Sequence, residues 1–305
     1  LPLGAESSFN AGLYAKALLE MMDICETLGD TKSVKMYKGW YEDIKKAFND
    51  AAWDGKWWIR WFDKEGNAYG THKAKYGKIY CNSQSWSVMS GIAYGERAVM
   101  GMDSLNKLLN TANGVKSSTP GYRGFDGRVG GISTYPPGAK ENGGIFLHTN
   151  PWVMIAETIL GRGDKAFQYY NQINPASKNA KLDEFESEPY CYPQNILGDE
   201  HKQFGMGRNA WLSGTSSWTY QAATQYIIGV RAGLQGLVVD PCIPSSWKGF
   251  TVTRKFRGAT YEITVKNPKG VCKGVASMVV DGKEIDSNVA PIFTKGVHKV
   301  EVTLG

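Results

Sequence analysis

The hydrophobic pattern changes its period once, near Gly236, and this change constrains the fold of the 305-residue chain more than any other feature. Before Gly236, apolar residues recur at three- to four-residue spacing, which predicts helices. After it, apolar and polar residues alternate with period two, which is typical of half-buried strands joined by turns. The helices are expected at 8–29, 31–49, 83–93, 96–110, 151–160, 164–173 and 217–229, and the strands at 237–240, 250–256, 259–266, 275–281 and 297–304.

The pattern therefore predicts a mainly α fold with a β module. Helix pairs fill residues 1–235, interrupted by a short hairpin within 50–69, and an antiparallel β unit fills residues 236–305. The first helix has an apolar stripe and ends at Gly29, a residue suited to a helix C-terminus. Its stripe is Leu13, Ala17, Met21, Ile24 and Leu28, and the stripe of the second helix is Val34, Tyr37, Tyr41, Ile44 and Phe48.

Two long polar loops, 111–150 and 174–214, separate the helices, and long ordered loops in a compact domain usually carry function. The stretch 133–152, STYPPGAKENGGIFLHTNPW, combines backbone-bending residues with many hydrogen-bonding groups and enters an apolar helix. Such a loop at a helix start can hold a sugar or an anion. His148 stands at that junction and is either an anion ligand or a structural hydrogen-bonding residue.

A second candidate is the run Ser213-Gly214-Thr215-Ser216, which opens a later helix. Its hydroxyls and free backbone N–H groups could cradle phosphate, although a plain N-cap explains the same residues. The third candidate, DEFESEPYCYPQ at 183–194, places carboxylates before Tyr192 and Gln194, which could bond sugar hydroxyls. An acidic surface loop is the commoner role of such a segment. Ser83-Gln84-Ser85-Trp86 is a weaker polar–aromatic cluster.

Composition excludes several classes of protein. The net charge of +6 is scattered without a run of like charges, so no nucleic-acid arm is expected. No 18-residue apolar stretch or signal peptide is seen, so no membrane partner is expected. The five Cys are odd in number and form no CxxC pair, which favours reduced thiols in a cytoplasmic protein over disulfides or zinc. The 10 Trp and 16 Tyr could stack on sugars, although a core position is the commoner role.

Four motifs, in order, resemble a known family: YPPGAKENGGIFLHTNPW, EPYCYPQNI, WLSGTSSW and DPCIPSSWKGFTVTRKFRGATYEITVKNP. Together they look like the C-terminal part of the cellobiose phosphorylases, whose relatives in glycoside hydrolase family 94 act on chitobiose, laminaribiose and cellodextrins. The resemblance spans essentially the whole chain. It implies the later part of an (α/α)6 barrel over residues 1–235, a C-terminal antiparallel β-sandwich over 236–305, and a cytosolic homodimer.

The resemblance also implies inverting phosphorolysis of a β-linked disaccharide, such as cellobiose, into an α-sugar 1-phosphate and a free sugar. Inorganic phosphate is then a substrate, and no cofactor or metal is implied. Phosphate is its own nucleophile, so one carboxylic acid suffices, whereas inverting hydrolases need two. The implied phosphate ligands are His148, Ser213, Gly214 and Thr215, Gln194 contacts the cleaved sugar, and Tyr135, Lys140 and Glu141 face the leaving sugar.

The family's general acid is an Asp in an Asp-Trp-Asn-Asp motif, which this sequence lacks. The resemblance implies that this motif and a phosphate-binding Arg belong to an N-terminal companion half. The first residue is Leu1 rather than Met, and we expect the chain to be a processed or partial protein that is inactive alone.

Three alternatives stay open at the level of sequence. A non-catalytic carbohydrate-binding module would use the aromatic residues and leave the phosphate cradle idle. An inverting hydrolase would need two carboxylates, for which Glu141 and Glu188 are the candidates. Among phosphorylases, Tyr135 suits packing against an unsubstituted sugar, which favours cellobiose over chitobiose, and laminaribiose is a further alternative.

Overall fold

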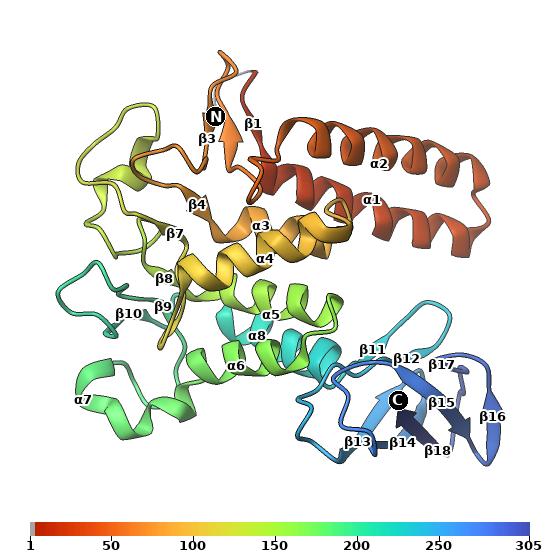
Figure 1. Ribbon diagram of the computed structural model, residues 1–305. Coiled ribbons are helices and arrows are strands. Elements are labelled where there is room, and N and C mark those ends of the chain that lie inside the picture. The colour runs from red at the N-terminus through yellow and green to blue at the C-terminus, as the bar shows by residue number, and fades with distance from the viewer. Residues whose placement is uncertain (1–3) are drawn as a thin grey trace. The chain divides into compact units, whose positions relative to one another are not determined.

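The computed structural model describes residues 4–305, and residues 1–3 of the predicted first domain lie outside this range (Figure 1). Contacts divide the chain into two compact units, and each is described by itself. The first unit holds residues 1–156 and 169–219, and the second holds 157–168 and 220–305. The predicted domain boundary after residue 235 falls within the second unit and stays a prediction.

The first unit begins with an antiparallel helix pair, α1 (Ser8–Leu28) and α2 (Thr31–Ala51), which lie side by side (Figure 1). The Ser7 hydroxyl caps α1 by accepting from the Asn10 amide at 3.3 Å, and Asp30 caps α2 through Ser33. Gly29 ends α1 with φ 75°, a left-handed conformation that favours glycine, as predicted. Helices α3 (Cys81–Met89), α4 (Gly95–Leu109) and α5 (Asn150–Ile159) also confirm predicted segments.

The apolar stripe predicted for α2 is buried at two positions, whereas the stripe predicted for α1 is exposed. On α2, Tyr41 and Phe48 are buried, which confirms the predicted face. On α1, the buried side chains are Ala15, Leu18 and Cys25 instead. The predicted stripe is exposed, and residues 4–305 do not cover it: Leu13 47%, Met21 38%, Ile24 44% and Leu28 76%.

Short strands pair segments of the loops in the first unit. The predicted hairpin is confirmed as β2 (Trp61–Phe62) and β3 (Ala68–Tyr69), which pair with β1 (Glu6–Ser7). Two further antiparallel pairs join β4 (Ile79–Tyr80) to β7 (Ser118–Thr119) and β5 (Asn110–Thr111) to β6 (Gly114–Val115). A third sheet has the order β10-β9-β8. Its strands are β8 (Ile145–Phe146), β9 (Pro193–Ile196) and β10 (Gly207–Ala210).

The other helical segments of the chain are short α-helices, 3-10 turns and one π-helical segment. The short helix α7 (Leu182–Phe185) follows the 3-10 segment η3 (Pro175–Lys181). Helix α6 (Gly163–Ile173) confirms a predicted segment, and α8 (Thr215–Gln221) passes into a π-helical segment, η4 (Ala222–Ile227). Two 3-10 turns, η1 (Gly130–Thr134) and η2 (Leu147–Thr149), belong to the loop that precedes α5.

The second unit contains a five-stranded sheet of order β13-β14-β18-β15-β16 and a three-stranded sheet of order β11-β12-β17. The five strands are β13 (Gly249–Phe256), β14 (Ala259–Lys266), β15 (Val275–Val280), β16 (Lys283–Ile285) and β18 (Val297–Leu304). The three are β11 (Val230–Ala232), β12 (Leu237–Val239) and β17 (Val289–Ala290).

The two sheets of the second unit share one hydrophobic core, to which Val239, Tyr261 and Val300 contribute fully buried side chains. The prediction of an antiparallel unit is wrong for one pair, because β14 and β18 run parallel. Strand alternation fixes which face a side chain takes but not the direction of the neighbouring strand, so sequence could not reveal this pairing. Within residues 4–305, no helix is long and apolar enough to cross a membrane.

Lys178 in η3 gives a prediction for the pH dependence of stability. The side chain is buried, and its Nζ donates to Asn113 Oδ1 at 2.9 Å. Burial, followed by repulsion from Lys181, lowers the pKa of Lys178 from 10.5 to about 8. Because this pKa is depressed by folding, its stability contribution is full above pH 10.5 and is lost as the pH falls through 8.

We therefore expect Lys178→Met to raise the free energy of unfolding at pH 7 by about 1–3 kcal/mol. Most of the gain is expected to disappear at about pH 10, where the wild-type amine is neutral when folded. Urea denaturation at both pH values measures the difference, with Lys35→Met, at an exposed position of α2, as the control. A gain that persists unchanged at the higher pH would contradict the assignment.

Candidate functional site

The loop before α5 is held in shape by Asn142. This side chain is fully buried. Its Oδ1 accepts from the Tyr122 amide at 2.7 Å, and its Nδ2 donates to the carbonyls of Tyr122 at 2.9 Å and Tyr135 at 2.6 Å. One amide thus ties the centre of the loop to its start and to the preceding segment, which positions Tyr135, Lys140 and Glu141.

Close backbone packing makes the same loop rigid. Gly138 has φ 83°, and a Cβ there would lie 2.7 Å from the His201 amide nitrogen. The Gly138 amide donates to the Asn142 carbonyl at 2.8 Å, and the Gly198 amide donates to the Gly138 carbonyl at 2.7 Å. The loop predicted from its glycines is therefore a packed structure and not a flexible connector.

The pairing of β8 with β9 brings Gln194 near the turn that carries His148. Ile145 pairs with Ile196, and Phe146 pairs with Asn195. The chain leaves β8 directly into the turn η2 that carries His148, while Gln194 precedes Asn195 on β9. The antiparallel register therefore places Gln194 beside the end of β8 where His148 begins its turn.

His148 sits between aromatic rings. Its imidazole centroid lies 4.7 Å from the Phe146 ring and 5.1 Å from the Trp152 ring, both in edge-to-face contacts. Burial among these rings lowers the pKa of His148 below its usual value of 6.5. The ring is therefore neutral at pH 7, and it presents one N–H donor and one acceptor to a ligand.

The start of α8 holds the second predicted group. The Ser213 Oγ accepts from the Thr215 amide at 3.0 Å, and the hydroxyls of Ser213 and Thr215 hydrogen-bond each other. Gly214, and not Ser213, directly precedes α8, so this bond closes a short turn before the helix, and the N-cap alternative stays a prediction. Gly214 is exposed, Ser213 is half-buried, and Thr215 is buried.

Trp152 joins the two predicted phosphate segments. Its ring centroid is 5.1 Å from that of His148 and 5.6 Å from that of Trp218. Trp218 belongs to the first turn of α8, and its amide donates to the Gly214 carbonyl at 3.2 Å. His148 and the Ser213–Thr215 segment, which are far apart in sequence, therefore both border the Trp152 and Trp218 pair. Sequence reasoning missed the role of Trp152, although it stands within the most informative motif.

Two predicted sugar contacts carry buried oxygen atoms without partners. Glu141 Oε2 and Gln194 Oε1 have no hydrogen-bond partner within residues 4–305. Buried acceptors normally have a partner, so each oxygen can take a donor such as a sugar hydroxyl. Beside them, Lys140 Nζ lies 5.1 Å from the centre of the Tyr135 ring. Lys140 has φ 47°, an uncommon conformation for a residue other than glycine.

Two weaker candidates have other roles. Gln84 donates to the Trp58 carbonyl at 2.8 Å and accepts from the Trp58 amide at 2.9 Å, so the Ser83–Trp86 cluster belongs to the core. Glu188, a candidate for a hydrolase, accepts from the indole N–H of Trp211. Within residues 4–305, no group of three or more His, Cys, Asp or Glu could hold a metal ion.

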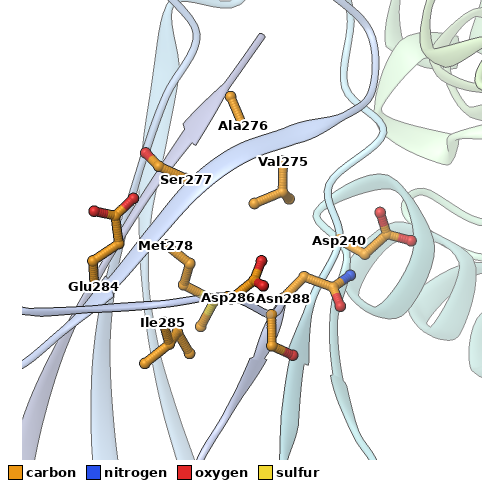
Figure 2. Close-up of a pocket in the computed structure, with 10 residues that line it drawn as sticks. Asp240, Val275, Ala276, Ser277, Met278, Glu284, Ile285, Asp286 and Asn288 are labelled. Atoms are coloured by element: carbon orange, nitrogen blue, oxygen red, sulfur yellow. The ribbon is translucent and has the colours of Figure 1, made fainter.

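A cavity of about 690 Å³ lies in the second unit (Figure 2). Figure 2 shows Asp286 beside Asn288, with Asp240 on one side and Glu284 on the other. Apolar side chains of Val275, Met278 and Ile285 contribute to the lining. None of the predicted site residues lines this cavity, so it adds nothing to the phosphate site.

Comparisons with known proteins agree with the motifs. The family model described as "Glycosyl hydrolase 94 superfamily, catalytic domain" matches residues 2–229. The N,N'-diacetylchitobiose phosphorylase of Vibrio proteolyticus is 40% identical over 304 residues, which is 99% of this chain and 38% of that protein. The same-named protein of Vibrio furnissii is 38% identical, again over 99% of this chain and 38% of its own length.

A more distant relative, the solabiose phosphorylase of Paenibacillus borealis, is 35% identical over 86% of this chain and 34% of its own length. The chain thus spans less than two fifths of these curated relatives. Among solved structures, a sialidase has a TM-score of 0.56 at 10% identity. It covers 81% of this chain and 22% of its own, which is a likeness of fold alone.

Proposed function

This chain belongs to the glycosyl hydrolase 94 superfamily, and from that premise we propose that it forms part of an inverting disaccharide phosphorylase. Inorganic phosphate attacks the anomeric carbon of a β-linked disaccharide, and the products are an α-sugar 1-phosphate and a free sugar. The observation that carries the proposal is that Trp152 contacts His148 and Trp218, next to the Ser213–Thr215 segment.

In this proposal the chain binds phosphate and does not supply the general acid. The neutral imidazole of His148 donates one hydrogen bond, and the start of α8 donates further bonds through the segment of Ser213, Gly214 and Thr215. Preorganised donors of this kind hold the nucleophile near the reacting carbon and stabilise charge that develops there. The unpaired oxygens of Gln194 and Glu141 take sugar hydroxyls, and Tyr135 with Lys140 flanks the leaving sugar.

The proposed fold assigns the helical part to the later helices of an (α/α)6 barrel and residues 236–305 to a β-sandwich. The antiparallel pair α1 and α2 supports the first assignment. The core shared by the two sheets of the second unit supports the second. The match of residues 2–229 to the catalytic-domain model of the family further supports the assignment of the helical part to the catalytic domain.

We also propose which β-linked disaccharide the enzyme cleaves. Tyr135 led to cellobiose as the expected substrate. Two relatives at 40% and 38% identity are named for N,N'-diacetylchitobiose, and this favours the chitobiose alternative over cellobiose. Relatives of lower identity are named for other sugars, so a panel of β-linked disaccharides is the appropriate test.

The whole enzyme is also a proposal, because the chain spans 38% of its relatives' length. We propose that a companion N-terminal segment supplies the general acid, and that residues 1–305 alone are inactive. A cytoplasmic homodimer is the assembly proposed for the complete protein. None of its parts requires a cofactor in this mechanism, because phosphate is the second substrate.

The experiment is a phosphorolysis assay of the protein that carries this chain together with its N-terminal segment. N,N'-diacetylchitobiose, cellobiose and laminaribiose are each incubated with and without phosphate, and the anomer of the product is read by NMR. We expect phosphate-dependent release of an α-sugar 1-phosphate. Sugar release without phosphate that is abolished by Glu141→Gln would instead indicate a hydrolase, and sugar binding without turnover would indicate a binding module.

A further inference from the structure

Arg60 occupies a fixed position between the first helix and the first small sheet. Its backbone amide donates to the Tyr69 carbonyl at 2.7 Å, and its carbonyl accepts from the Ser8 amide at 3.1 Å. The residue directly precedes β2, and Ser8 opens α1. These two main-chain hydrogen bonds fix the backbone of Arg60, from which its side chain extends.

The guanidinium of Arg60 is surrounded by aromatic rings and has no carboxylate partner among the described residues 4–305. Its Cζ lies 5.6 Å from the Phe9 ring centre, 5.8 Å from Tyr80 and 5.9 Å from Trp61. Nη1 donates to the Ser7 hydroxyl at 3.3 Å. Within residues 4–305 it makes no salt bridge with a carboxylate, and burial lowers its pKa.

Two other cations of the first unit show how unusual this is. Lys116 is also buried, and it pairs with Asp199 at 2.8 Å. Arg97 also stacks on an aromatic ring, that of Trp53 at 5.5 Å, but it is exposed and donates to the Asn49 carbonyl at 2.9 Å. Aromatic faces and one hydroxyl compensate a partly desolvated charge only in part, so Arg60 favours an anionic partner.

Two tryptophans near Arg60 carry indole N–H groups that have no acceptor within residues 4–305. The Phe9 ring contacts the indoles of Trp86 at 5.6 Å and Trp152 at 5.8 Å, and those two indoles are 5.3 Å apart. Both indole Nε1–H groups are buried without a partner within residues 4–305. Arginine and tryptophan side chains can only donate, so this cluster fits a ligand rich in acceptors.

We propose that Arg60 binds an oxyanion, with the indole N–H groups of Trp86 and Trp152 as neighbouring donors. The oxyanion is either the phosphate of the substrate, in which case the inference rests on the proposed function, or a carboxylate of the protein from outside residues 4–305. Phosphate fits because the same Trp152 borders His148, which burial keeps neutral and which therefore brings no positive charge to the site. Arg60 supplies that charge.

The test compares Arg60→Gln and Arg60→Met with Arg97→Gln in the complete protein. Thermal melting is followed with and without phosphate at matched ionic strength, and the KM for phosphate is measured in the phosphorolysis assay. If phosphate is the oxyanion, both Arg60 variants lose the phosphate-induced rise in Tm, and the KM for phosphate rises about tenfold or more. Arg97→Gln keeps the wild-type response in both measurements.

If a carboxylate is the oxyanion, Arg60→Met lowers Tm equally with and without phosphate. The Tm difference from wild type then shrinks as the pH falls below about 4, where carboxylates are protonated. A Tm loss that depends on neither phosphate nor pH, or no loss and no KM change, overturns the proposal and leaves Arg60 as a stacking residue. The melting measurements do not need turnover, so they stand even if the proposed reaction fails.

Discussion

Replacing His148 with alanine is expected to lower kcat/KM for phosphate by about 10²–10³-fold, because the variant removes the imidazole donor that we propose for the nucleophile. The disaccharide KM is expected to stay within about threefold, since the proposed sugar contacts belong to other residues. Steady-state kinetics with each substrate varied in turn measures both values. His148→Asn keeps a donor and is expected to lose less.

His298 provides the matched control. It lies in β18 of the second unit, where its Nδ1 is 2.7 Å from Asp281 Oδ2. His298→Asn is expected to leave the KM for phosphate unchanged. Equal losses in the His148 and His298 variants, or a His148 variant that fully retains phosphate dependence, would contradict the assignment of His148.

The lowered pKa of His148 has a consequence that can be measured directly. Its stability contribution is full above the usual pKa of 6.5 and is lost as the pH falls through the depressed value in the folded protein. A bound phosphate dianion favours the protonated imidazole, so phosphate is expected to raise the pKa of His148. An NMR titration of the imidazole, with and without phosphate, records the shift.

Asn142→Ala is expected to destabilise the protein by about 2–4 kcal/mol, because it breaks three buried hydrogen bonds and leaves their partners unpaired. The partners are the amide and carbonyl of Tyr122 and the carbonyl of Tyr135. Urea denaturation measures the loss. Asn179, which is exposed, is the control, and its alanine variant is expected to change stability by less than about 0.5 kcal/mol.

The same variant is expected to weaken turnover, because Asn142 sets the position of Lys140 and Glu141. Asn142→Asp keeps the acceptor but places a buried carboxylate oxygen against the two carbonyls, so its loss of activity should be at least as large as that of alanine. A fully stable Asn142→Ala protein would show that backbone packing around Gly138 suffices to hold the loop.

Most helices and strands could be predicted because their signals are local. Periodicity and the stop at Gly29 gave α1 and α2 almost to the residue, and period-two alternation gave β13, β14 and β18. The face of α1 that contacts the rest of the first unit could not be predicted. A stripe such as Met21, Ile24 and Leu28 shows that a helix side is apolar, but not which neighbour covers it.

The candidate site was predictable in its residues and not in its geometry. The loop around His148 and the hydroxyl run at 213–215 stand out by composition, and the resemblance assigned them to phosphate. The contact of Trp152 with both His148 and Trp218 depends on packing between segments about sixty residues apart, which no local pattern encodes. The unpaired oxygens of Glu141 and Gln194 and the unpaired charge of Arg60 likewise appear only when burial and partners are known.

A crystal structure of the complete protein with bound phosphate would show whether His148 and the start of α8 share this ligand. We expect a phosphate with one oxygen about 3 Å from a ring nitrogen of His148 and another at a similar distance from a hydroxyl or amide of residues 213–215. Phosphate bound elsewhere, with His148 and the start of α8 contacting no common ligand, would contradict it.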